Sequence, residues 1–264
     1  MALRYSTKIR QLAAGTLSWR QILKNFRLKY YSGVQPTTAD EAINGTLLAV
    51  FTESAGAFTA EVAAQASITL AGAAGSVDTI KIGGAIEILG ASVPFNSDLT
   101  TTAADVAAAI NEYNSVINVY AESSGAVITL TAPIGMGTDG NALALAVTTT
   151  TLTATINGGS SAVFGGAGSP QVGVTSINGL NFAAPVAGVF AKDGTWQSSA
   201  VASGTAGWFR IEVDPTDDQS ASTDFPRIDG SIATAGSDLT LTSTAIVAGS
   251  VQTIGTFTLT VPAS

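Results

Sequence analysis

The densest group of side chains that could do chemistry is acidic. Four aspartates, Asp214, Asp217, Asp218 and Asp224, lie in the segment DPTDDQSASTD. Closely spaced carboxylates can bind a divalent cation or transfer protons, but the ligand spacing of an EF-hand loop is absent. Prolines and serines surround the acids, and nothing in this pattern holds carboxylates in the rigid geometry that catalysis needs. We therefore predict a solvated loop that does no chemistry, with a weak divalent-ion site as the alternative.

The composition excludes whole classes of catalyst. The 264-residue chain contains no histidine and no cysteine. Ser-His-Asp and Cys-His mechanisms, most zinc sites, thiolate chemistry and disulfides are therefore ruled out. Any two of the 19 acidic residues could be paired on paper as a glycosidase site, so a carboxylate-based hydrolase stays open as one hypothesis. We predict that the protein is not an enzyme and has no catalytic residue, no cofactor and no metal ligand.

Two tryptophans suggest a different kind of site. Trp196 and Trp208 could stack on sugar rings at an exposed surface. Only 7% of the chain is aromatic, however, and large aromatic side chains contribute most when they are buried. We therefore expect both tryptophans in a hydrophobic core, with a glycan-binding surface as the alternative.

A third candidate is the basic N-terminal segment. Residues 1–29 contain seven basic side chains and no acidic one, whereas the rest of the chain has a net charge of −15. Such a segment can dock on an acidic protein surface. Binding to nucleic acid is the competing interpretation, although the acidic body would repel DNA, and a solvated basic helix face also stays open. We predict docking through Arg4, Lys8, Arg10, Trp19, Arg20, Ile22, Leu23, Lys24, Phe26 and Arg27.

Hydrophobic spacing predicts the elements that carry these residues. Ser18 can cap a helix in which Trp19, Ile22, Leu23 and Phe26 share one face. A shorter helix is expected before it. From Phe26 onward apolar residues alternate, which predicts a strand. We interpret residues 1–30 as a basic amphipathic arm.

Alternation also predicts strands on both sides of a segment of different composition. The flanking strands are expected at 46–52, 208–213, 238–247 and 252–262. Between about 63 and 169 alanine, threonine and glycine dominate. There the pattern predicts strands at 67–70, 79–82 and 86–89, a helix at 103–113 and a hairpin of 116–121 with 126–131.

The expected fold class is mainly β. We predict an antiparallel β-sandwich host domain with an N-terminal helical arm and an inserted small β-rich (α+β) module. The host comprises residues 31–62 plus 170–264, and the inserted module comprises 63–169, with one helix at about 103–113. A loop tip between paired strands tolerates such an insertion because a longer loop costs little extra entropy.

No targeting or membrane segment is expected. The longest apolar run, Ala183–Ala191, is far shorter than the ~20 residues of a membrane helix. The N-terminus also lacks the apolar block of a secretory signal. We expect a protein that is made in the cytoplasm.

Several sequence segments resemble a known family. They are MALRYSTKIRQLAAG, YYSGVQPTTADEAINGTLLAVF, INGLNFAAPVAGVFAKDGTWQSSAVASGTAGWFRIEV and RIDGSIATAGSDLTLTSTAIVAGSVQTIGTFTLTVPA. They cover most of 1–58 and 174–263 and resemble virion structural proteins of tailed bacteriophages. The stretches TTTAADVAAAINEY and VYAESSGAVITLTAP are similar to small β-rich modules of phage tail and sheath-like proteins.

This resemblance implies a structural subunit of the virion, made in the cytoplasm of the bacterial host. We expect an accessory assembly protein of the head or neck, as capsid decoration or collar. Its partners would be capsid, portal, neck or tail subunits and further copies of itself, with no nucleic acid and no membrane. The alternative is a tail or tail-fibre component that binds a host receptor or glycan.

Overall fold

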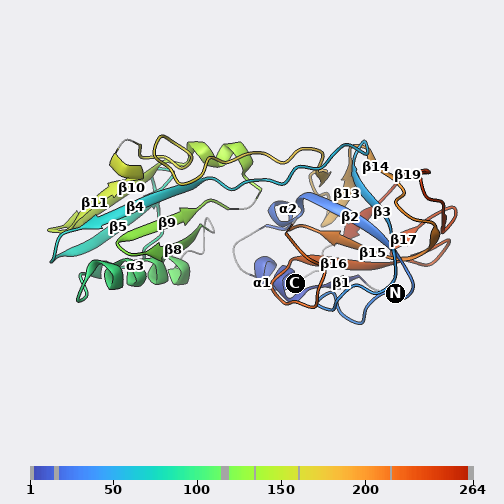
Figure 1. The fold of residues 1–264 in the computed structure, drawn as a ribbon, viewed down its shortest axis with the longest axis horizontal. Helices are drawn as coiled ribbons and strands as arrows, with labels where there is room; N and C mark the ends of the chain where they lie inside the picture. The colour runs from blue at the N-terminus through green and yellow to red at the C-terminus, as the bar shows by residue number, and fades with distance from the viewer. Residues whose placement is uncertain are drawn as a thin grey trace. The chain divides into compact units, whose positions relative to one another are not determined.

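The computed structural model describes residues 3–14, 18–113, 119–133, 135–159, 161–214 and 216–260. The chain divides into two compact units (Figure 1). Each unit has its own hydrophobic core. Unit 1 comprises Met1–Ala60 and Ser176–Ser264, and unit 2 comprises Glu61–Thr175. The predicted mainly β, antiparallel fold class with few helices is confirmed. No helix in the described ranges is long and apolar enough to span a membrane.

Unit 1 is built from one extensively branched sheet that curls into a half-barrel, a sandwich-like arrangement. Its helices are α1 (Thr7–Ala14) and α2 (Trp19–Ile22). Its strands are β1 (Arg4–Tyr5), β2 (Lys24–Ser32), β3 (Leu47–Glu53), β12 (Leu180–Phe182), β13 (Val189–Asp193), β14 (Trp196–Ser199), β15 (Gly204–Glu212), β16 (Arg227–Ala233), β17 (Leu239–Thr240), β18 (Ala245–Ile246), β19 (Val251–Ile254) and β20 (Thr258–Thr260).

Seven of these strands follow one another around the core. In spatial order they are β17, β16, β15, β2, β3, β14 and β19, and each is hydrogen-bonded to the next. All of these pairs are antiparallel except β16 with β17. The two ends of the series, β17 and β19, are not paired with each other. The series therefore has one open seam.

The core of unit 1 is aromatic. Phe26 stacks on Phe182 at 5.0 Å between ring centroids, and Trp196 meets both rings edge-on. Trp196 and Trp208 are fully buried. The expected burial of both tryptophans is therefore confirmed, with Trp196 in this core and Trp208 stacked on Tyr31, and neither can offer a surface to a sugar ring.

The N-terminal residues are part of this fold, which corrects the prediction of a separate arm. β1 pairs with β16, and Ser6 extends this contact: its backbone N–H donates to the carbonyl of Arg227, and its hydroxyl accepts the backbone N–H of Arg227. The predicted cap at Ser18 is present, with Gln21 completing a capping box. The helix that it starts ends at Ile22, however, because Asn25 takes a left-handed φ of 61° and β2 has already begun.

The long strand predicted at 238–247 is also corrected. Only the two-residue β17 and β18 form there, because the chain leaves β16 after Thr240 and crosses to β15 at Ala245. The strand predicted at 252–262 is split into β19 and β20, and its last two residues lie outside the described ranges.

Unit 2 contains two four-stranded antiparallel sheets and one long helix. The sheets run in the orders β10-β5-β6, with β7 also on β5, and β11-β4-β9-β8. The elements are β4 (Gln65–Ala71), β5 (Ser76–Ile82), β6 (Ile86–Glu87), β7 (Val93–Pro94), α3 (Leu99–Tyr113), β8 (Tyr120–Ser124), β9 (Val127–Thr131), η1 (Gly137–Ala142), β10 (Leu145–Thr150), β11 (Thr153–Ile156) and η2 (Asn157–Gly159).

Helix α3 covers this core with Val106, Ala107 and Ile110. It begins one turn earlier than predicted, because the carboxylate of Asp98 accepts the backbone N–H of Thr101 and caps it. Thr102 lies inside the helix, where its hydroxyl donates to the Asp98 carbonyl. The predicted hairpin is present as β8 and β9, although residues 116–118 lie outside the described ranges.

Candidate functional site

The acidic segment lies directly after β15 and leads into β16, so the register of these two strands places its residues. Arg210 lies opposite Asp229, and Glu212 lies opposite Arg227. Two short sequences of complementary charge, Arg210-Ile211-Glu212 and Arg227-Ile228-Asp229, therefore face each other in antiparallel order. All four charged side chains are buried, with relative exposures of 0 to 1%. One face of this strand pair consequently carries a polar network instead of a hydrophobic core.

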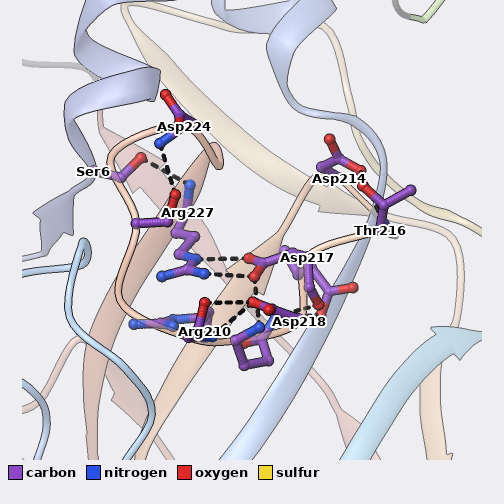
Figure 2. A network of polar contacts seen from close by, with 12 residues as sticks. Ser6, Arg210, Asp214, Thr216, Asp217, Asp218, Asp224 and Arg227 are labelled. Atoms are coloured by element: carbon purple, nitrogen blue, oxygen red, sulfur yellow. Dashed lines mark hydrogen bonds and ion pairs between the residues drawn. The ribbon is translucent and has the colours of Figure 1, made fainter.

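Asp217 belongs to this network, which corrects the prediction that all four aspartates are solvated. Its carboxylate accepts two hydrogen bonds from the guanidinium of Arg227, at 2.6 Å from Nε and 2.5 Å from the terminal nitrogen (Figure 2). The backbone N–H of Gln219 donates a third at 2.8 Å. Asp217 is 7% exposed and Arg227 is 0% exposed. The paired geometry and the burial together make this a structural ion pair.

A second bidentate ion pair joins Arg210 to Asp229. Nε of Arg210 donates to one carboxylate oxygen at 2.7 Å, and a terminal nitrogen donates to the other at 2.8 Å. Burial raises the pKa of Asp229, and Arg210 partly offsets this effect. The same guanidinium also donates to the backbone carbonyls of Ala39 and Glu41. Arg210 therefore links the backbone of residues 39–41 to the β15–β16 strand pair by hydrogen bonds.

Glu212 connects the network to β2. It forms ion pairs with both Arg27 and Lys29, and it accepts a hydrogen bond from the side chain of Gln219. Arg27 also lies over the ring of Phe58, 4.8 Å from its centroid. Two of the seven N-terminal basic residues thus share one carboxylate inside unit 1.

The other three acids lie toward solvent. Asp214 is half-buried and accepts two hydrogen bonds from Thr216, whereas Asp218 and Asp224 are exposed. Asp218 accepts from the hydroxyl and the N–H of Ser220, and the hydroxyl lowers the pKa of Asp218 below its ordinary value. These contacts close local turns. Among the described residues no group of three or more acidic side chains is arranged to hold a metal ion.

The predicted docking residues divide into three groups. Ile22, Leu23 and Phe26 are at most 2% exposed and belong to the core of unit 1, so their assignment to a docking surface is wrong. Arg27 is held by Glu212. The remaining predicted side chains are exposed or half-buried: Arg4, Lys8, Arg10, Trp19, Arg20 and Lys24.

Trp19, one of these remaining residues, belongs to an aromatic pair. Trp19 packs edge-on against Tyr5, with 5.4 Å between the ring centroids. Arg10 donates a local hydrogen bond to the hydroxyl of Thr7, and Thr7 in turn donates to the carboxylate of Asp40. We define the candidate docking surface as the exposed cations of α1, α2 and the start of β2, which are Arg10, Arg20 and Lys24.

Sequence reasoning missed Arg210, Glu212, Arg227 and Asp229. The signal that could have found them is the complementary pair of segments RIE and RID. Opposite charges facing each other across antiparallel strands stabilise the pairing. Once 208–213 is expected to be a strand, RID is its best charge-matched partner in the second half of the chain.

No family model, characterised protein or solved structure shows a significant match to this chain.

Proposed function

We propose that the chain is a structural subunit of a tailed-bacteriophage particle, an accessory assembly protein of the head or neck that acts as capsid decoration or collar. The sequence resemblance described above supports the phage assignment. One observation supports a structural role over a catalytic one. Asp217, the buried member of the acidic cluster, forms an ion pair with Arg227 inside the fold. The acidic segment, which was the strongest candidate for a catalytic site, therefore contributes a carboxylate that stabilises unit 1.

The exposed basic side chains support a docking role. Arg10 of α1, Arg20 of α2 and Lys24 of β2 are exposed, and Trp19, which precedes Arg20 in the chain, is half-buried. A ring or lattice of subunits brings such a patch against the same acidic surface many times, so weak contacts add up. The partner in this proposal is an acidic surface of a neighbouring virion subunit or of a further copy of the chain.

Charge reversal tests the docking surface. An exposed ion pair contributes about 0.5 kcal/mol, so losing three of them lowers affinity about tenfold. We expect the triple variant Arg10→Glu, Arg20→Glu, Lys24→Glu to fold normally and to incorporate into particles at least tenfold less efficiently. Rising salt should weaken incorporation of the wild-type chain as well, because it screens exposed charges.

The control variant is Lys81→Glu, which reverses an exposed charge in unit 2. Incorporation is measured by complementing a phage that lacks the gene. If the triple variant incorporates as well as the control, this surface does not dock. If labelled antibodies find the wild-type chain on no purified particle, the structural-subunit proposal itself fails.

A further inference from the structure

The seam between β17 and β19 opens into a cavity. The cavity has a volume of about 270 Å³ and lies between residues 239–243 and 252–256. Its floor is formed by Tyr30 of β2 and Phe51 of β3, which belong to the middle of the seven-strand series. The seam is therefore a direct entry to the interior of the curled sheet.

The backbone along both sides of the seam has unused hydrogen-bonding groups. Among the described strands, β17 is paired only with β16, and β19 only with β14. Beyond these short strands, the N–H groups of Thr242, Ser243, Gly255 and Thr256 donate to no acceptor among the described residues. Two open sheet edges that face each other present the hydrogen-bonding pattern that a strand needs on both of its sides.

The side chains that line the cavity are uncharged. Leu239 and Ile254 are buried on its two sides, and threonine and serine hydroxyls form its rim. The hydroxyl of Tyr30 is buried on the floor and has no hydrogen-bond partner among the described residues. Burial raises the pKa of Tyr30, so this group stays a neutral donor. An occupant must therefore be uncharged where it faces the cavity, apolar or hydroxylic on its inner side, and rich in hydrogen-bonding groups.

We propose that this seam binds an extended segment of a partner polypeptide, which adds a strand between β17 and β19. A strand of alternating threonine and valine meets all three requirements: its backbone pairs with both edges, its inner side chains cover the floor, and it carries no charge. The cavity is also smaller than the roughly 300–1,000 Å³ of typical small-molecule pockets. The inference goes beyond the proposed function, because it concerns the isolated chain and does not depend on the identity of the particle.

The test uses the full-length protein and two synthetic peptides. The probe is acetyl-KTVTVTVTK-amide, and its control is acetyl-KTVTPTVTK-amide, whose central proline removes a strand N–H and its hydrogen bond. Amide shifts in NMR spectra and hydrogen exchange are followed at Thr242, Ser243, Gly255 and Thr256. At a peptide concentration ten times its Kd, we expect these amides to exchange about tenfold more slowly with the probe and to be unchanged with the control.

Two variants check that the seam is responsible. Thr242→Lys and Thr256→Lys place a charge on each edge, and neither side-chain hydroxyl has a hydrogen bond to lose among the described residues. We expect both to abolish the peptide effect, whereas the exposed control Thr38→Lys should retain it. Equal responses to both peptides, no response at millimolar probe, or protection of these amides by glucose in place of the probe would each overturn the proposal. The comparison of the two peptides is made on the wild-type protein. It therefore tests the proposal even if one of the lysine variants fails to fold.

Discussion

Replacing Asp217 by asparagine should destabilise unit 1 severely. The substitution keeps the shape of the side chain but removes its charge, and the guanidinium of Arg227, which is 0% exposed, then loses its ion-pair partner. Two hydrogen bonds of 2.6 and 2.5 Å lose their charged acceptor. Breaking a buried ion pair from one side costs about 3–5 kcal/mol. Typical domains have only about 5–15 kcal/mol of stability in total, so the change removes a large share of it.

The matched control is Asp218→Asn, the same substitution at the next residue, where the carboxylate is exposed. All three tryptophans of the chain lie in unit 1, so tryptophan fluorescence during urea unfolding reports on this unit alone. We expect Asp218→Asn to stay within about 0.5 kcal/mol of wild type and Asp217→Asn to fall by at least about 3 kcal/mol.

A double variant sharpens this result. Asp217→Leu with Arg227→Met replaces both charges by apolar groups and should recover most of the loss, because no charge is left uncompensated. If Asp217→Asn unfolds at the same urea concentration as Asp218→Asn, the pair does not stabilise the fold. The structural reading of the acidic segment would then be refuted.

Three further predictions concern the rest of the chain. Phe26→Ala should lower the stability of unit 1 by about 3–5 kcal/mol, measured by tryptophan fluorescence; a stable variant with impaired assembly would restore Phe26 to a docking role. Replacing residues 61–175 by a short Gly-Ser bridge should leave unit 1 with a cooperative thermal transition, because Thr59 and Ile177 already exchange two backbone hydrogen bonds where the chain leaves and returns; an aggregated product would contradict this. Hydrogen bonding to Thr101 lowers the pKa of Asp98, so the stability that Asp98 gives to unit 2 is present above the ordinary pKa of 3.8 and is lost as the pH falls through the folded pKa. In calorimetry, the melting temperature of unit 2 should therefore depend less on acidic pH in Asp98→Asn than in wild type. An unchanged dependence would show that this cap is not pH-sensitive.

The local spacing of hydrophobic and capping residues predicted most of the helices and strands. It missed the elements whose ends are determined by pairing with strands far away in the sequence. The alternation of Trp208–Val213 and the cap at Ser18 are signals carried within a few residues, and both are present. The spacing of Trp19, Ile22 and Phe26 fits one helical face equally well as a short helix followed by a buried strand. Pairing of Phe26 with Leu180 of β12 decides between them, and no local signal shows that pairing.

The site was missed for a related reason. Asp217 and Arg227 are ten residues apart, and nothing within the segment distinguishes Asp217 from the exposed Asp218 beside it. Its burial follows from the fold of the loop over the β15–β16 pair, where the guanidinium of Arg227 is already buried. A rule that treats acids near proline and serine as solvated therefore fails at the one acid that the tertiary structure covers.

Quantitative mass spectrometry of purified particles tests the central claim most directly. Under the proposed function, the particles are those of the tailed phage whose genome carries this gene. The copy number is measured relative to the major capsid protein before and after a high-salt wash. A structural subunit predicts a fixed number of copies per particle that purifies with infectivity and falls when salt screens the basic docking surface. Recovery of the chain only in the soluble fraction of the lysate, with none on the particles, would contradict the account.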